Sequence, residues 1–208
     1  MVVLNEEKII FIHIPKTAGS AIELLLLKSK KNVYKNKFYG ISKFNNHSKA
    51  MHHLTAKDLK SILNNYNDFF KFTIIRNPYS KLISEYYWCE VENMGYKSKQ
   101  SFDKFLDDIE IIVNNNKYED SIYYDHFMPQ YFFVYDENKD IIVDYIGKYE
   151  KLNESVQFIK SKFNITSELP IFEKYINRMT NKIILNESQK NRIYNLYKKD
   201  FQLFDYKR

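Results

Sequence analysis

The fold is decided near the start of the chain by the stretch Lys8-Ile-Ile-Phe-Ile-His-Ile-Pro-Lys-Thr-Ala-Gly-Ser20. As far as Ile14 it is an apolar run of strand length that is rich in β-branched residues. The residues from Pro15 to Ser20 are typical of a tight loop, and Ala21–Lys28 has the composition of a helix. We therefore predict a strand, a tight loop and a helix in direct succession.

The predicted loop combines several features of an anion-binding site. Gly19 allows backbone N–H groups to approach a ligand closely, and the start of the next helix adds unpaired N–H donors and a positive dipole end. Lys16 adds a mobile charge, while Thr17 and Ser20 add hydroxyl groups. The Gly-x-x-x-x-Gly-Lys-Ser/Thr pattern of nucleotide P-loops is absent, because the lysine here precedes the glycine. We predict an anion cradle of another kind.

A second candidate anion site follows the next buried strand, which we predict over Phe69–Ile75. Arg76 stands at its carboxyl end, where open parallel sheets bind ligands. Pro78 favours a turn into a helix over Tyr79–Glu92. Ser84 lies eight residues after Arg76, about two helical turns onward, so its hydroxyl can reach an anion that Arg76 holds. The alternative is a capped helix with a surface arginine and a buried serine.

Strands and helices alternate along the rest of the chain. We predict a loop over 29–53, helices over 55–64, 102–113, 155–162 and 187–204, and a strand over 140–146. This alternation is typical of a parallel sheet with helices on its faces. The predicted fold is therefore α/β: a single P-loop-like domain over residues 1–208, with a mostly parallel central sheet flanked by helices.

Composition excludes several classes of protein. A single cysteine among 208 residues excludes an intrachain disulfide framework and any multi-cysteine metal site. Hydrophobic residues at 44% and aromatic residues at 17% exclude a disordered chain. No apolar run approaches the roughly 20 residues that span a bilayer, and Met1–Asn5 lack the basic region and long apolar stretch of a signal peptide. We expect a cytoplasmic protein without stable membrane insertion.

The net charge of +6 arises from 28 lysines and only four arginines set against 26 acidic residues. Such a bias, with 21 asparagines beside it, indicates a general enrichment in lysine more than a built basic surface. Where arginine is avoided, those that are kept are candidates for planar, bidentate contacts with an anion. Arg76 is the candidate that follows a strand.

The segments Pro15-Lys-Thr-Ala-Gly-Ser20 and Arg76-Asn-Pro…Ser84-x-Tyr86 resemble the two cofactor motifs of the carbohydrate sulfotransferase family. That family includes heparan sulfate 2-O- and chondroitin sulfotransferases and their bacterial relatives. Its donor is 3′-phosphoadenosine-5′-phosphosulfate (PAPS), whose 5′-phosphosulfate is held by the first motif and whose 3′-phosphate is held by the second. The segments 126–130 and 144–150 are similar to later landmarks of the family.

The resemblance implies a role for each matching residue. Lys16 takes the place of the essential loop lysine, and the backbone of Thr17, Ala18, Gly19 and Ser20 that of the phosphate-binding loop. Arg76 and Ser84 take the places of the groups that bind the 3′-phosphate, and no metal is implied. Two departures are lysines at 81 and 148, where arginine is common. The segment 172–182, with Lys174 and Arg178, matches no adenosine-contacting pattern.

Sulfuryl transfer to a hydroxyl needs a base, and histidine is suited to that near neutral pH. His53, in a segment that is similar to the catalytic one of bacterial relatives, is the candidate base, with His52 as its rival and a candidate for substrate contact. His126 and Gln130 are further candidates for contact with the acceptor. His13, inside the first strand, is interpreted as a core residue.

Three functions are weighed. The first is PAPS-dependent transfer of a sulfuryl group to a glycan such as a capsular polysaccharide or lipopolysaccharide precursor. A groove for an acidic polysaccharide and an ordinary solvated surface are the two interpretations of the lysines at positions 28, 30, 31, 35, 37, 43 and 49. The second is a small-molecule kinase with the same cradle, against which stands the lack of an acidic pair for Mg²⁺. The third is a non-enzymatic polyanion binder, although no nucleic-acid recognition motif is present and no nucleic-acid partner is expected. The oligomeric state is left open.

Overall fold

A mixed four-stranded sheet forms the centre of the fold in the computed structural model, which describes residues 1–28, 41–44, 47–92, 100–118, 120–121, 123–170 and 183–208. Its strand order is β1-β2-β5-β6, with β1 Val2–Leu4, β2 Ile9–Ile12, β5 Phe70–Ile75 and β6 Tyr145–Lys148. Strands β2, β5 and β6 run parallel, and β1 pairs with β2 in the antiparallel sense. The predicted α/β fold with a mostly parallel sheet is confirmed.

The chain divides into two compact units, each built from separate parts of the sequence. The first unit, which contains the sheet, comprises residues 1–76 and 130–171, and the second comprises 77–129 and 172–208. Each unit is described by itself below. The single domain expected over residues 1–208 stays a prediction.

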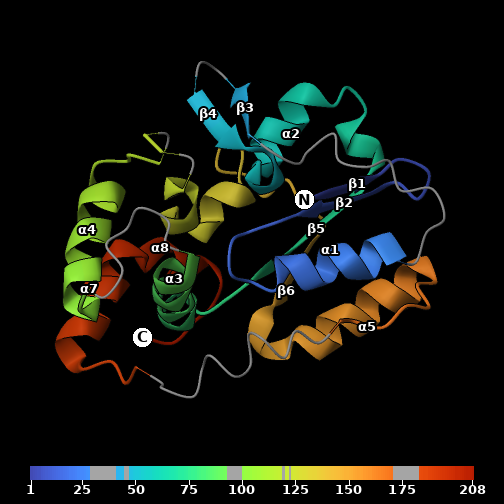
Figure 1. Ribbon diagram of the computed structural model, residues 1–208. Helices are drawn as coiled ribbons and strands as arrows, with labels where there is room; N and C mark the ends of the chain where they lie inside the picture. Colours follow the sequence, from blue (N-terminus) through green and yellow to red (C-terminus); the bar gives the residue numbers. More distant parts are fainter. Residues whose placement is uncertain (29–40, 45–46, 93–99, 119, 122, 171–182) are drawn as a thin grey trace. The chain divides into compact units, whose positions relative to one another are not determined.

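Two helices of the first unit, α1 (Gly19–Lys28) and α5 (Leu152–Phe163), lie side by side against the sheet (Figure 1). Every residue of β2 is buried, as expected of a central strand with a continuous apolar run. The core joins side chains of the sheet to side chains of both helices. They include Leu4, Ile9, Phe11, Phe72 and Ile74 from the strands, Ile22, Leu25 and Leu26 from α1, and Val156 and Ile159 from α5.

The strand expected over 140–146 lies farther along the chain, because β6 begins at Tyr145 and continues to Lys148. Gly147 is therefore inside the strand and does not end it. A Cβ atom at this position would lie 2.5 Å from Oγ of Ser155 and 2.6 Å from Cδ1 of Ile74. The glycine is needed because α5 packs very closely on the strand.

The register of the parallel strands brings three carboxyl ends to one edge of the sheet. Ile12 pairs with Thr73, and Ile75 pairs with Lys148. The loop after β2, Arg76 after β5 and Tyr149 after β6 therefore leave the sheet at the same edge, which is the edge where open α/β sheets bind ligands.

Part of the predicted loop over 29–53 is regular structure. Strands β3 (Ile41–Phe44) and β4 (His47–Ala50) pair as an antiparallel hairpin, and a 3₁₀ turn, η1, covers Met51–His53. The loop prediction was wrong there, because few apolar residues mark the hairpin. The next helix, α2 (Ala56–Ile62), has the predicted cap: Thr55 Oγ1 accepts from the Asp58 N–H at 3.1 Å, and the Thr55 N–H donates to Asp58 Oδ2 at 2.9 Å. A further turn, η2, covers Tyr66–Asp68.

The described part of the second unit is helical. It consists of α3 (Pro78–Glu92), α4 (Phe102–Asn114), the turn η3 (Tyr124–Phe127), α7 (Glu187–Leu196) and α8 (Lys198–Leu203). Phe105, Leu106 and Ile109 of α4 are buried in its core with Ile193 of α7. The helix expected over 187–204 is divided at Tyr197, whose hydroxyl donates to the carbonyl of Phe127 at 2.9 Å.

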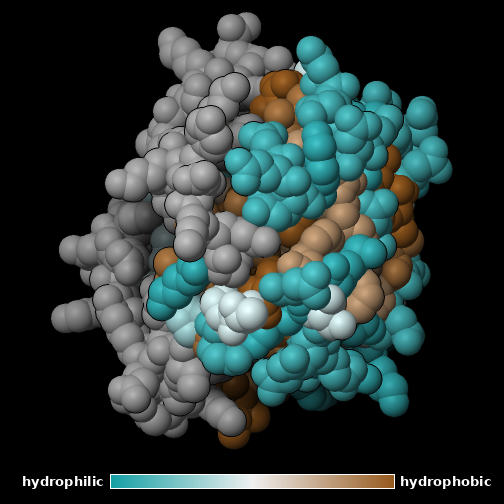
Figure 2. Space-filling model, turned by 90° about the vertical axis from the view of Figure 1, so that its right-hand side faces the viewer, coloured by the Kyte–Doolittle hydropathy of each residue, from teal (hydrophilic) through white to brown (hydrophobic). Residues whose placement is uncertain are grey.

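Hydrophilic residues cover much of the face drawn in Figure 2, with hydrophobic residues between them. This mixture is ordinary, since apolar atoms contribute more than half of most protein surfaces. Among the residues that the structure describes, no helix combines the length and the apolar character that a membrane crossing requires.

Candidate functional site

The loop after β2 has a strained backbone that is suited to anion binding. Lys16 and Ala18 both adopt left-handed conformations, with φ of 64° and 71°. Such conformations are unfavourable for residues with a Cβ atom and are concentrated at functional sites. Thr17 is buried, and its hydroxyl donates to the carbonyl of Ile14 at 2.8 Å, which helps to hold the turn. That hydroxyl therefore serves the loop, while the Thr17 backbone keeps its predicted role.

The first turn of α1 completes the cradle. The carbonyl of Ala18 accepts from the N–H groups of Ala21 and Ile22 at 3.0 and 3.1 Å, so the helix begins directly after the strained residues. The first N–H groups of a helix have no carbonyl within it to bond, and they carry the positive end of its dipole. Ser20 is exposed beside them and Lys16 is half-buried. The predicted cradle residues are thus brought together at one sheet edge.

His13 lies directly beneath this loop. A Cβ atom at Gly19 would lie 1.9 Å from Cδ2 and 2.0 Å from Nε2 of the His13 ring, so the glycine is needed to make room for the imidazole. His13 Nδ1 is 2.8 Å from Oε1 of Glu23, a buried residue of α1. The interpretation of His13 as a buried residue with a partner is confirmed, but His13 follows β2, which ends at Ile12, and does not lie inside the strand. The sequence argument did not find its contact with the loop or its partner Glu23.

The pKa values of this pair are displaced by burial and by their hydrogen bond. Burial lowers the pKa of His13 to about 4, although the bond with Glu23 acts in the opposite direction. Burial by itself raises the pKa of Glu23, but the bond from His13 leads the contributions that bring it down to about 2. At neutral pH a neutral His13 therefore donates from Nδ1 to an ionised Glu23.

This arrangement predicts a pH-dependent stability. Below its ordinary pKa of 6.5, His13 in the unfolded chain binds a proton that the folded chain does not bind until about pH 4. The unfolding free energy should therefore fall between pH 6.5 and 4, by up to about 3 kcal/mol from this residue. Urea unfolding across this range should show a flatter curve for His13→Gln, which keeps a donor for Glu23. Parallel curves for both proteins would contradict the assignment.

The candidate base lies against His13. His53 ends the turn η1 and is buried, and its ring meets the His13 ring edge to face with centroids 5.0 Å apart. The His52 ring is 4.0 Å from that of His53 and 6.3 Å from that of His13. Because His13 also touches the loop at Gly19, the structure brings His53 and the predicted cradle to the same place in the first unit. His52 is more exposed than His53.

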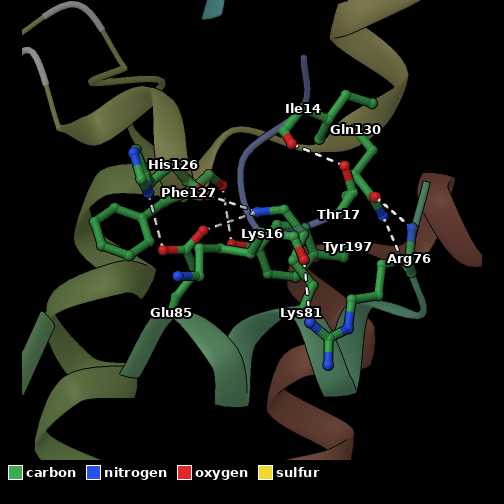
Figure 3. Close-up of polar contacts among 10 residues, drawn as sticks. All are labelled: Ile14, Lys16, Thr17, Arg76, Lys81, Glu85, His126, Phe127, Gln130 and Tyr197. Carbon is green, nitrogen blue, oxygen red and sulfur yellow. Dashed lines mark hydrogen bonds and ion pairs between the residues drawn. The ribbon is translucent and has the colours of Figure 1, made fainter. Parts of the chain in front are cut away.

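Arg76 joins the second motif to the first. Its guanidinium donates from Nη1 to the carbonyl of Lys16 at 3.1 Å (Figure 3). Its Cζ lies 4.1 Å from the centre of the Tyr149 ring. The side chain is buried, with 5% of its area exposed. Arg76 therefore contacts the cradle directly, as expected of residues that serve one ligand. The sequence argument missed Tyr149, although it noted the segment in which this residue lies.

Gln130 holds the backbone of Arg76. The Arg76 N–H donates to Oε1 of Gln130 at 2.8 Å, and Nε2 of Gln130 donates to the Arg76 carbonyl at 2.7 Å (Figure 3). Gln130 begins the turn η4 (Gln130–Phe133) and has no exposed area. The amide of Gln130 thus pairs with the chain at the end of β5, and its predicted contact with the acceptor stays a prediction.

Removal of the two hydrogen bonds between the Gln130 amide and the Arg76 backbone, here called the Gln130 clamp, should destabilise the protein. Gln130→Ala leaves the buried N–H and carbonyl of Arg76 without these partners, at about 1–3 kcal/mol for each group. We expect the unfolding free energy to fall by about 2–4 kcal/mol in urea or guanidinium titrations. The control is Gln157→Ala, at an exposed position of α5, which should stay within about 0.5 kcal/mol of the parent. Equal stabilities of the two variants would contradict the clamp.

In the second unit, His126 is held by a buried carboxylate. Its Nδ1 is 2.9 Å from Oε2 of Glu85, and its ring stacks on Trp88 with centroids 4.3 Å apart. Lys81 donates to the His126 carbonyl at 2.6 Å and lies 3.7 Å from Oε1 of Glu85 (Figure 3). These contacts orient the imidazole. Its predicted contact with the acceptor stays a prediction, as does the pairing of Ser84, on α3, with Arg76.

Lys81 and Lys148, the two lysines at positions where arginine is common in the family, differ in their surroundings. Lys81 is fully buried, and burial lowers its pKa although Glu85 and Asp200 act in the opposite direction. It therefore has a structural part among the helices of the second unit. Lys148 is half-buried at the end of β6.

Some predictions fall outside the described residues. These are the segment with Lys174 and Arg178 and most of the possible lysine groove. Among the groove lysines only Lys28 has a described side chain, and it is exposed.

Comparison with known proteins agrees with the two motifs. A family model described as "Sulfotransferase family" matches residues 1–207, which is nearly the whole chain. Comparisons with curated proteins and with solved structures gave no match. The match covers the cradle, Arg76, the histidines of the first unit and all of the second unit except its last residue.

Proposed function

Because the chain belongs to the sulfotransferase family, we propose that it moves a sulfuryl group from PAPS to a hydroxyl group of a glycan. The acceptors that we propose are capsular polysaccharides, lipopolysaccharides or related saccharides. The observation that supports the proposal most is the meeting of three elements at one sheet edge of the first unit. They are the strained loop with Lys16, the guanidinium of Arg76 and the imidazole of His53.

The donor set fits the proposed cofactor. PAPS carries anionic groups at its 5′ and 3′ positions, and it would supply the activated sulfuryl group. The backbone from Thr17 to Ser20 and the amino end of α1 are suited to the 5′ group. Arg76 offers the planar, permanently charged group that suits a phosphate. Ser84 is the proposed second ligand of the 3′-phosphate, and no residue of the proposed site requires a metal.

The proposed mechanism assigns one task to each reactive side chain. His53 accepts the proton of the acceptor hydroxyl as that oxygen attacks sulfur. Lys16 offsets negative charge on the oxygen that leaves with the 5′-phosphate. His13, held by Glu23, positions both His53 and the loop that carries Lys16. Its ring contacts the loop at Gly19 and also the His53 ring. His52 and His126 are proposed contacts for the acceptor.

Calorimetric titration separates this proposal from phosphate transfer with ATP. We expect adenosine 3′,5′-bisphosphate to bind tightly, because it carries both phosphates that the two motifs are proposed to hold. ATP lacks a 3′-phosphate and should bind at least tenfold more weakly. Tight binding of ATP with no binding of the bisphosphate would overturn the proposal in favour of a kinase.

A further inference from the structure

Tyr149 occupies a special place beside Arg76. It begins the turn η5 (Tyr149–Lys151) directly after β6, while Arg76 directly follows β5. Since Ile75 pairs with Lys148 in the parallel register, Arg76 and Tyr149 are the next residues on the two neighbouring strands. The sheet itself therefore sets the guanidinium above the phenol ring, with Cζ 4.1 Å from the ring centre.

The Arg76 side chain is thus held by contacts that include the following. Its guanidinium carbon lies over the Tyr149 ring, and the Lys16 carbonyl accepts from Nη1 at 3.1 Å. A guanidinium binds phosphate through the N–H groups at its edges, in its own plane, so a ring on its face does not compete with such an anion. A long side chain that is ordered before the ligand arrives loses less entropy on binding.

We propose that Tyr149 is a positioning residue that orients Arg76 for the 3′-phosphate of the donor and so contributes to recognition of that phosphate. This inference rests on the proposed function, because it takes Arg76 to be the 3′-phosphate ligand. The aromatic face carries the effect, and the hydroxyl does not contribute. Tyr149 itself does not touch the phosphate.

The test uses two nucleotides that differ at one group: adenosine 3′,5′-bisphosphate and AMP, which lacks the 3′-phosphate. Titration calorimetry on the full chain should show that Tyr149→Leu weakens bisphosphate binding about 3- to 30-fold and AMP binding less than about twofold. Tyr149→Phe keeps the aromatic face and should stay within about twofold of the parent for both ligands. Thermal unfolding of each variant checks that the fold is kept.

A second comparison asks whether Tyr149 acts through Arg76. In an Arg76→Gln background, Tyr149→Leu should leave the remaining bisphosphate affinity unchanged, since the group that it positions is gone. An equal loss for bisphosphate and AMP, or no loss for either, would overturn the role of Tyr149 while leaving the proposed function in place. A parent protein that does not bind the bisphosphate would overturn both.

Discussion

Lys16→Ala is expected to lower the rate of sulfuryl transfer by about 10²- to 10³-fold, the usual cost of removing one group that stabilises charge in a transition state. Bisphosphate affinity should fall less, by about tenfold, because the charge that Lys16 offsets is largest during transfer. Alanine keeps a Cβ atom, so the left-handed backbone at this position, with φ of 64°, is no less strained in the variant. The loss of transfer rate therefore measures the contribution of the Lys16 ammonium group.

A matched control is available on α2. Lys57 follows His53 by four residues, but its side chain is exposed and pairs with exposed Glu137 at 3.8 Å. Lys57→Ala should keep the parental rate. Initial rates of labelled sulfate transfer at saturating PAPS measure both variants. A Lys16→Ala protein that works at the parental rate would show that the loop binds its ligand without taking part in the chemistry.

His53→Ala is expected to lower turnover by about 10²- to 10⁴-fold, the usual contribution of a positioned general base. Bisphosphate affinity should stay within about threefold of the parent, because the base acts on the acceptor hydroxyl and not on the nucleotide. This split between rate and binding distinguishes a base from a residue that only supports the loop. Single-turnover assays and calorimetry on the same samples measure the two quantities.

The same assays decide between the neighbouring histidines. We propose His53, which is buried and contacts the His13 ring edge to face, whereas His52 is more exposed. His52→Ala, at a proposed acceptor contact, should therefore weaken acceptor binding more than it lowers turnover. If His52→Ala loses the rate and His53→Ala keeps it, the roles of the two residues are exchanged.

The elements that carry the cradle could be predicted because local sequence determines them. The short apolar run rich in β-branched residues favours a strand, and β2 occupies its part from Ile9 to Ile12. The cap at Thr55 satisfies its helix with neighbouring residues alone. The residue types of the loop predicted an anion site, and the family resemblance added which anion it binds. Its two left-handed residues, Lys16 and Ala18, have no signature in composition, since glycine is the usual residue for that conformation.

The contacts around Arg76 could not be predicted, because they depend on distant parts of the chain. Gln130 is 54 residues away from Arg76 in sequence. Its amide bonds the N–H and the carbonyl of Arg76, as the backbone of a neighbouring strand would, and only the folded chain brings the two residues together. Tyr149 stacks on Arg76 because of the register between β5 and β6. The hairpin over 41–50 was missed for a related reason, since polar strands with little alternation look like loops.

The most direct test of the central claim is incubation of the purified chain with PAPS and a panel of glycans that includes capsular polysaccharide and lipopolysaccharide fragments. Mass spectrometry follows the saccharide while chromatography follows the nucleotide. The account predicts a sulfate ester on a saccharide hydroxyl, together with one adenosine 3′,5′-bisphosphate for each ester formed. Both products should form about 10²- to 10³-fold more slowly with Lys16→Ala. Sulfate esters that form as fast with Lys16→Ala as with the parent, or sulfation of non-sugar acceptors alone, would contradict it.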